Sequence, residues 1–190
     1  MFQFKNSRMD IDRVSLICSE GILLATNSKN HIICGLDERI YCCVPHTNYY
    51  RDLIQEVGIL ADYQTRDRGQ KMTVTQMKDV LHRKYDASES MDILLAGQDS
   101  KGLHIYNMGL NSESTNLVYA VKGNQGMEDA YQYLTEHWQE SMNIQNAEQM
   151  ARKVLQVGES DFVDMCFIYK TRTMEIDESN QEESLEALSP

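Results

Sequence analysis

The sequence predicts one α/β (α+β) domain of the four-layer αββα kind, in which two β-sheets pack face to face and helix pairs cover the outer faces. Two observations predict this class. Segments with the alternating period of strands and segments with the helical period occur in groups along the chain, which favours packed sheets with helices outside them. A length of 190 residues with 42% apolar residues also suits a single domain with its own core.

The first strands lie near the N-terminus. Apolar and polar residues alternate over residues 13–18, and Gly21 can supply the left-handed backbone conformation that a short hairpin turn needs. Residues 22–26 are continuously apolar, which is typical of a strand covered on both faces. Two shorter strands are predicted at residues 31–34 and 39–44.

A long amphipathic helix is expected next. Apolar residues at helical spacing predict a helix that begins near His46 or Thr47 and runs to Ala61. Because glycine inside a helix costs about 1 kcal/mol relative to alanine, Gly58 indicates a close contact with another helix. The polar stretch 64–71 is predicted to separate this helix from the next one.

A capping box marks the second helix, which is predicted over residues 73–85. Thr73 is followed three residues later by Gln76, so each side chain can bind the backbone N–H of the other residue. The second half of the chain repeats the grouped order. It is predicted to form strands at 92–97, 103–108 and 116–122, a helix at 127–138, a helix capped by Asn143 that runs to 155, and a closing strand at 162–170.

The chain is predicted to divide into one domain and two end segments. Residues 1–10 are a short N-terminal extension, residues 11–174 are the domain, and residues 175–190 are an acidic, disordered tail. The stretch from Thr171 to Pro190 carries six acidic residues and one basic residue. This tail is either a solvated extension or a segment that binds a neighbouring basic surface, and the sequence leaves both readings open.

Charge and composition exclude several functions. The chain has 29 acidic and 18 basic residues and no basic stripe, so neither nucleic acid nor an anionic membrane is an expected partner. The five histidines are scattered and the cysteines lack paired spacing, so no metal site and no cofactor are predicted. The odd number of cysteines among apolar residues indicates reduced core thiols in a cytoplasmic or nuclear protein. They are Cys18, Cys34, Cys42, Cys43 and Cys166.

Several segments match a known family in consistent order. Residues 21–29 (GILLATNSK), 94–99 (LLAGQD) and 119–126 (YAVKGNQG) resemble its strand motifs, and residues 141–155 resemble its last helix. The joint order, over about residues 10–174, is what makes the match specific. The sequence therefore resembles a proteasome β-type subunit of the N-terminal-nucleophile hydrolase family, and the resemblance implies an αββα sandwich of that type.

The resemblance also implies that the catalytic positions are replaced. Active members use a mature N-terminal threonine as nucleophile, together with a lysine and an aspartate. In this register Ile11 stands at the nucleophile and Asn27 at the aspartate, while the segment 29–36 that would carry the lysine is shortened. Asn124 replaces a supporting serine, and Asp161 keeps a second aspartate without the serine and glycine that follow it in the family. The chain is therefore predicted not to be an enzyme.

The resulting hypothesis is a non-catalytic, structural β-type subunit of the 20S proteasome core particle. The chain would form part of a seven-membered β ring, in a stacked-ring hetero-oligomer with other β and α subunits. It would support ubiquitin-dependent protein degradation by its partner subunits. The helices at 46–61, 73–85 and 127–157 are the expected contact surfaces.

Two alternatives remain open from the sequence. One is an active N-terminal-nucleophile peptidase of the threonine type, or one cut at an unusual serine or cysteine. Ser7, Ser15 and Cys18 are the nearest such residues, and none has an adjacent histidine to activate it. The other alternative is a free-standing assembly or binding factor with the same fold.

Overall fold

The computed structural model describes residues 9–86, 90–109 and 116–171, which form eight strands and four helices. Their grouped order is the predicted one. The elements are β1 (Asp10–Cys18), β2 (Gly21–Thr26), β3 (His31–Asp37), β4 (Ile40–Pro45), α1 (Asn48–Arg68), α2 (Val74–Lys84), β5 (Asp92–Asp99), β6 (Gly102–Gly109), β7 (Tyr119–Gln125), α3 (Met127–His137), α4 (Ile144–Val154) and β8 (Asp164–Tyr169).

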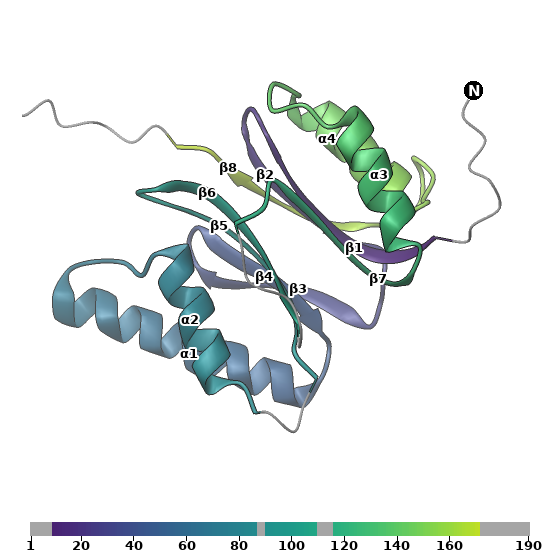
Figure 1. The fold of residues 1–190 in the computed structure, drawn as a ribbon. Coiled ribbons are helices and arrows are strands. Elements are labelled where there is room, and N and C mark those ends of the chain that lie inside the picture. Colours follow the sequence, from purple (N-terminus) through teal and green to yellow (C-terminus); the bar gives the residue numbers. More distant parts are fainter. Residues whose placement is uncertain (1–8, 87–89, 110–115, 172–190) are drawn as a thin grey trace, which may run out of the picture.

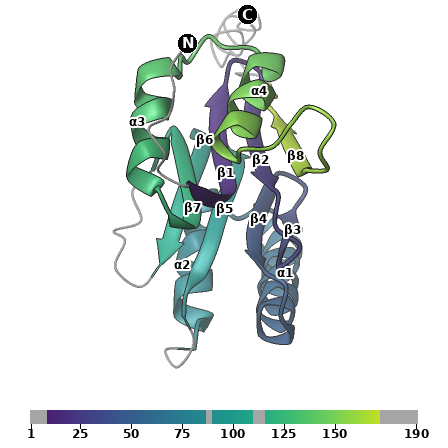
Figure 2. The same cartoon turned by 90° about the vertical axis from the view of Figure 1, so that its right-hand side faces the viewer.

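The elements form four layers (Figure 1). Sheet A has the strand order β7-β1-β2-β8 and sheet B the order β3-β4-β5-β6, with antiparallel neighbours throughout. The helices α3 and α4 cover sheet A, and α1 and α2 cover sheet B, as the view turned by 90° also shows (Figure 2). The predicted αββα sandwich is therefore confirmed.

Three apolar layers hold these elements together. Ile22, Leu24, Leu94 and Ile105 are fully buried between the two sheets. A second layer lies between sheet A and its helices, and a third lies between sheet B and its helices. All six residues of β2 are buried, as its continuous apolar sequence predicts for a strand covered on both faces.

The end of α3 is joined to sheet A by Trp138. Its indole Nε1 donates a hydrogen bond to the carbonyl oxygen of Ile17 in β1 at 2.8 Å. The ring also meets the edge of Tyr119 in β7, with 5.7 Å between the ring centroids. One half-buried side chain thus contacts two strands of the sheet that its helix covers.

Both predicted caps are confirmed. The Thr73 side chain accepts from the backbone N–H of Gln76, and the Gln76 side chain accepts from the backbone N–H of Thr73. At the start of α4, the Asn143 side chain accepts from the backbone N–H of Asn146 at 2.9 Å. These bonds satisfy backbone donors that the first turn of each helix leaves without an intrahelical partner.

Several predicted boundaries are wrong. The long helix α1 continues past Ala61 to Arg68, so most of the polar stretch 64–71 is helical and the helix ends at Gly69, whose φ is 67°. A solvent-facing last turn needs no apolar residues, and only the left-handed glycine ends it. Strand β7 begins at Tyr119 instead of residue 116. Strand β8 begins at Asp164, after the exposed Phe162.

Two further expectations change with the structure. Gly58 does not contact a second helix, because a methyl group added at this position would have the carbonyl oxygen of Leu36, in β3, as its nearest neighbour at 3.8 Å. Met9 and Asp10, assigned to the N-terminal extension, belong to the folded unit, because Met9 is buried and Asp10 begins β1. The acidic tail 175–190 lies outside the described residues.

Candidate functional site

Ile11, the residue at the nucleophile position of the resembled family, is a core residue. It lies in β1 with its Cα opposite Gly123 of β7, and the residue is 3% exposed. Its side chain belongs to the apolar layer between sheet A and the helices α3 and α4. This position therefore holds a buried hydrocarbon with no group that could attack a substrate.

Two of the other three predicted positions contact the same end of β1. The Asn27 backbone N–H donates to the carbonyl oxygen of Asp12 at 3.2 Å, and its side-chain amide donates to the carbonyl oxygen of Leu155 at 3.0 Å. The Asn124 amide donates to Oδ2 of Asp10 at 2.9 Å. Both asparagines thus act as neutral donors that bind neighbouring segments.

Asp161 has a local role in the loop between α4 and β8. Its Oδ2 atom accepts from the backbone N–H of Gly158 at 2.6 Å, and its carbonyl oxygen accepts from Arg152 Nη1 at 3.1 Å. The structure therefore brings Ile11, Asn27 and Asn124 to one end of β1, while the Asp161 carboxylate closes its own turn.

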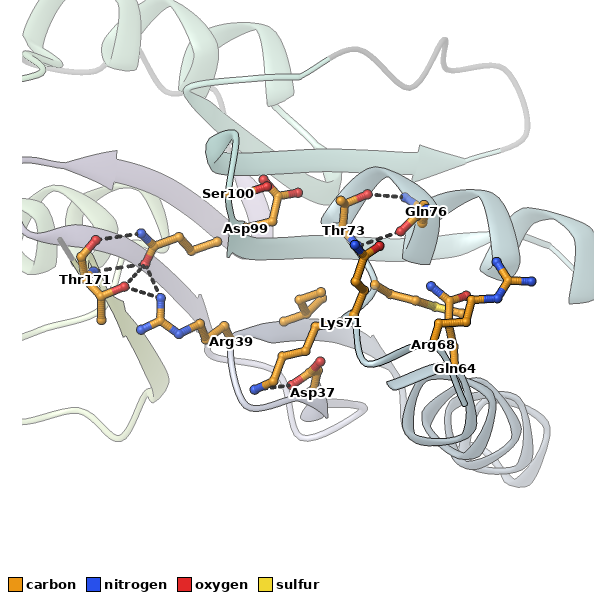
Figure 3. Close-up of a pocket in the computed structure, with 14 residues that line it drawn as sticks. Asp37, Arg39, Gln64, Arg68, Lys71, Thr73, Gln76, Asp99, Ser100 and Thr171 are labelled. Atoms are coloured by element: carbon orange, nitrogen blue, oxygen red, sulfur yellow. Dashed lines mark hydrogen bonds and ion pairs between the residues drawn. The ribbon is translucent and has the colours of Figure 1, made fainter. Parts of the chain in front are cut away.

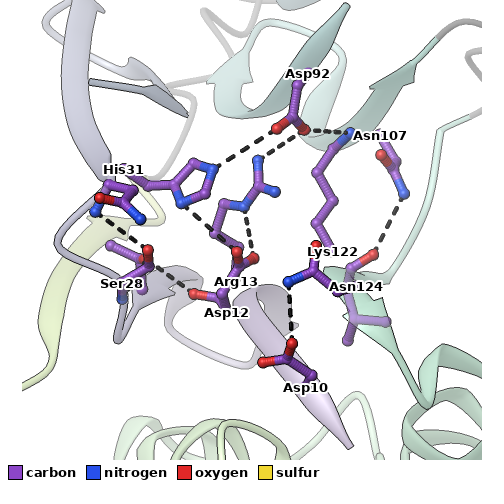
Figure 4. Close-up of polar contacts among 12 residues, drawn as sticks. Asp10, Asp12, Arg13, Ser28, His31, Asp92, Asn107, Lys122 and Asn124 are labelled. Atoms are coloured by element: carbon purple, nitrogen blue, oxygen red, sulfur yellow. Dashed lines mark hydrogen bonds and ion pairs between the residues drawn. The ribbon is translucent and has the colours of Figure 1, made fainter. Parts of the chain in front are cut away.

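Beside this end of β1 lies a group of charged side chains from both sheets, which we call the intersheet cluster (Figure 4). It consists of Asp12, Arg13, His31, Asp92 and Lys122. Arg13 of β1 donates through Nε to Asp12 Oδ1 at 2.9 Å and through Nη1 to Asp92 Oδ1 at 2.7 Å. Asp92 begins β5, so this second bond joins sheet A to sheet B.

The remaining two members extend the contacts to β3 and β7. Lys122 Nζ lies 3.1 Å from Asp92 Oδ1 and donates to the carbonyl oxygen of Met108 at 2.9 Å. The His31 ring lies between the two carboxylates, with Nδ1 3.6 Å from Asp12 Oδ2 and Nε2 3.6 Å from Asp92 Oδ2. Each sheet therefore contributes two strands to the cluster.

The cluster shifts the titration of its own members. Burial alone would raise the pKa of Asp92, but hydrogen bonds from His31 and Arg13 and the charges of Arg13 and Lys122 hold this pKa well below its usual range. Burial lowers the pKa of Lys122, and the Asp92 carboxylate offsets only part of that effect. The Asp92 carboxylate thus stabilises the charged forms of Arg13 and Lys122.

The arrangement offers no activated nucleophile among these described residues. Burial raises the pKa of the nearby Cys43 thiol to about 12, so this thiol is protonated at neutral pH. The Thr26 hydroxyl donates to the carbonyl oxygen of Asp12 at 2.8 Å and is buried. What the cluster can do chemically is to bind the two sheets to each other through paired charges.

The alternative nucleophiles Ser15 and Cys18, which were considered from the sequence, are not exposed to a substrate either. The Ser15 hydroxyl is fully buried and donates to the carbonyl oxygen of Leu23 at 3.0 Å. Cys18 is buried, and burial raises its pKa. Ser7 lies outside the described residues. All five cysteines are free in the structure, three of them buried and two half-buried.

Across residues 9–86, 90–109 and 116–171, no group of three or more His, Cys, Asp or Glu side chains is arranged to hold a metal ion. No helix in the same stretches is long and apolar enough to cross a membrane.

An open hollow of about 590 Å³ lies at the opposite end of β5 from the intersheet cluster (Figure 3). The end of α1, the connection to α2 and the turns β3–β4 and β5–β6 form its walls. We call it the Arg68 hollow. The lining residues that matter below are Asp37, Arg39, Arg68, Lys71, Asp99 and Thr171.

Two antiparallel sheets lie between two helix pairs and are joined by partly buried ion pairs, which defines a protein of the αββα sandwich class. The model of the family described as Proteasome subunit matches residues 13–164, and the chain belongs to this family. No curated protein matches the chain. Membership implies a subunit of the proteasome core that takes part in protein degradation by assembling with other proteasome subunits in a multimeric complex.

The members of the intersheet cluster were not identified from the sequence. A signal for them exists, because Arg13, Asp92 and Lys122 are charged residues within or next to otherwise apolar strands. A buried charge at such a position needs a partner. The sequence alone cannot give that partner, since residues 13, 31, 92 and 122 meet only when both sheets are assembled.

Proposed function

We propose that this chain is a non-catalytic, structural β-type subunit of the 20S proteasome core particle. The observation that carries the proposal is the side chain of Ile11. Active members of the resembled family have a threonine hydroxyl at this register position, whereas Ile11 is a hydrocarbon that is 3% exposed. A hydrocarbon can neither attack a carbonyl carbon nor transfer a proton.

The residues before Ile11 support the same conclusion. An N-terminal nucleophile needs a free α-amine on the same residue, so the chain would have to be cut directly before it. Met9 is buried here, and the Asp10 carboxylate accepts a hydrogen bond from Asn124. A cut before Ile11 would remove both contacts and would still leave no hydroxyl.

The charges near Ile11 are already bound to one another. Arg13 and Lys122 both contact Asp92, and Asn27 carries no charge. Lys122 Nζ contacts the Asp92 carboxylate and the carbonyl oxygen of Met108, and neither group is a nucleophile that it could activate. Paired cations of this kind support a structural role in joining the two sheets.

The β-type assignment and the ring arrangement follow from the resemblance. The chain would occupy one position of a β ring, with other β and α subunits as neighbours in stacked rings. Its partner subunits would cleave the substrates of ubiquitin-dependent degradation. The five free cysteines support a reducing compartment, and we place the protein in the cytoplasm and the nucleus.

The proposal can be tested on the tagged chain purified from cells in which it is expressed. Native mass spectrometry should find it in a complex with other proteasome subunits, and its intact mass should include Met9 and Asp10. A covalent probe for threonine nucleophiles should label catalytic subunits in the same complex but not this chain. Those subunits serve as the positive control.

Three outcomes would overturn the proposal. A new N-terminus that begins with threonine, serine or cysteine would favour an N-terminal-nucleophile peptidase. Covalent labelling of this chain by the probe would have the same meaning. Recovery of the chain without any other proteasome subunit would favour a free-standing assembly or binding factor.

A further inference from the structure

The last described residue, Thr171, is held at the mouth of the Arg68 hollow. The side-chain amide of Gln98 binds its backbone at two points: Nε2 donates to the Thr171 carbonyl oxygen at 3.1 Å, and Oε1 accepts from the Thr171 N–H at 3.0 Å. Arg39 Nη1 donates to Oε1 of Gln98 at 3.1 Å and to the Thr171 hydroxyl. Gln98 is buried, so this contact fixes where the chain leaves β8. Figure 3 shows Thr171 beside Arg39.

The exposed charge lining the hollow is basic. The two acidic residues in its wall are largely covered, because the Asp37 and Asp99 side chains are 15% and 6% exposed. Asp99 also accepts hydrogen bonds from two backbone N–H groups. The Lys71 side chain, by contrast, is 51% exposed. Lys71 Nζ pairs with the exposed Glu38 outside the wall and lies 4.0 Å from Asp37 Oδ1, and the exposed pair is weak enough to exchange for another carboxylate.

Arg68 is the basic group best placed to accept a new partner. It is exposed, and within residues 9–86, 90–109 and 116–171 no hydrogen bond or ion pair involves its guanidinium. Two further hollows, of about 430 and 670 Å³, share Gln64, Arg68 and Met72 with the first one. Together they continue from Thr171 towards Arg83 on α2.

The chain that follows Thr171 carries the complementary charge. Its acidic residues begin four positions beyond Thr171, a separation that an extended chain spans within about 14 Å. They are Glu175, Asp177, Glu178, Glu182, Glu183 and Glu186. We infer that the acidic segment 175–186 binds the Arg68 hollow of its own chain through Arg68 and Lys71.

Attachment makes weak contacts sufficient for this binding. A short tether keeps a ligand at an effective concentration in the millimolar range, so a few exposed ion pairs are enough to populate the bound state. Such pairs are screened by salt. The binding should therefore weaken as ionic strength rises, and it does not depend on the proposed proteasome role.

Zero-length carbodiimide cross-linking of the full-length chain tests the inference. The chain is used alone and in whatever assembly co-purifies with it, as an equal mixture of light and ¹⁵N-labelled protein. The expected product joins Lys71 to a carboxylate of segment 175–186 within one chain, either light–light or heavy–heavy. Its yield should fall by at least about threefold in Arg68→Glu, and also on going from low salt to about 0.5 M salt.

Arg66→Glu is the matched control. Arg66 lies on the same helix, is exposed and pairs with Asp62, but it does not line the hollow. Its replacement should leave the yield within about twofold. The inference is overturned if the products are light–heavy, which means a second copy binds the tail, or if the tail links to Lys153 on α4 as often as to Lys71. Equal losses in Arg66→Glu and Arg68→Glu, or no Lys71 product, would overturn it as well.

Discussion

At the residue scale, the contacts of Asp92 matter most to the joining of the sheets. Its Oδ1 atom lies 2.7 Å from Arg13 Nη1 and 3.1 Å from Lys122 Nζ, and its Oδ2 atom faces His31. Arg13 is 5% exposed, so it cannot exchange this partner for water. A buried cation that loses its carboxylate retains the cost of desolvation without the compensating attraction.

The replacement Asp92→Asn should therefore lower the free energy of unfolding by about 3 kcal/mol at pH 7. Urea denaturation followed by circular dichroism measures this loss. The control is Asp62→Asn, which removes an exposed ion pair with Arg66 on α1 and should cost less than about 0.5 kcal/mol. Equal losses in the two variants would mean that the intersheet cluster contributes no more than a surface pair.

Wild type and Asp92→Asn should also differ in how their free energy of unfolding depends on pH. Because the folded-state pKa of Asp92 lies below its unfolded value of about 3.9, its contribution is present above that pH and is lost as pH falls towards the folded-state value. The difference between wild type and Asp92→Asn should then shrink from pH 7 to pH 3. A difference that stays constant over this interval would contradict the assigned shift.

Sequence reasoning succeeded where a residue's role depends on its own strand. The apolar character of Ile11 and the loss of charge at Asn27 can be read directly, and β2 was predicted as fully covered. It failed for His31, whose carboxylate neighbours come from β1 and β5. Contacts of this kind depend on the packing of two sheets, which no local pattern encodes.

At the element scale, Gly58 and Gly123 differ in how closely neighbouring atoms pack against them. In Gly58 of α1, an added methyl group would lie 3.8 Å from its nearest neighbour, the Leu36 carbonyl oxygen, which is an ordinary contact. In Gly123 of β7, it would lie 2.2 Å from the Asp10 carbonyl oxygen and 2.7 Å from the Cα of Ile11. Strand β1 thus approaches β7 so closely that only glycine fits.

Opposite effects are expected from alanine at these two positions. Gly58→Ala should raise the free energy of unfolding by up to about 1 kcal/mol, because alanine is the better helix former. Gly123→Ala should lower it by about 2–3 kcal/mol, because the backbone of β1 must move. Chemical denaturation of both variants measures these two changes in the free energy of unfolding. If Gly58→Ala is destabilising, the added methyl group must clash within the chain, and the Leu36 carbonyl oxygen of β3 is its nearest neighbour.

Elements with strong local signals were predicted well, and their ends were predicted poorly. The capping box at Thr73 and Gln76 located the start of α2 because both partners lie within one turn. The end of α1 was missed because its last turns face solvent and carry no apolar stripe up to Gly69. The sequence signal for this end was Gly69, because glycine readily takes the left-handed conformation that ends a helix.

At the scale of the whole molecule, α1 presents apolar side chains to the outside. Ile59 and Tyr63 are 62% and 67% exposed and lie one helical turn apart. Exposed apolar groups that occur together favour protein contacts. Ile59 lies within residues 46–61, which are among the contact surfaces expected from the sequence, and Tyr63 follows directly after that range. A subunit contact in the proposed assembly would cover both side chains.

Replacing Ile59 by glutamate should therefore reduce incorporation of the chain into its complex. The fraction of tagged chain that co-purifies with other proteasome subunits is the measurement, and a loss of at least about fivefold is expected for a charge placed in an apolar contact. Gln55→Glu is the control, since Gln55 is also exposed on α1. Unchanged incorporation of Ile59→Glu would remove this part of α1 from the interface, provided that both variants melt at the same temperature as wild type.

The contact made by Trp138 has an optical consequence. It is the chain's one tryptophan, and it senses sheet A alone through Ile17 and Tyr119. Its fluorescence should shift to longer wavelength when α3 separates from sheet A, even while α1 and α2 stay in place. Comparing emission with the ellipticity of all four helices would reveal whether the two outer layers melt in one transition or in two.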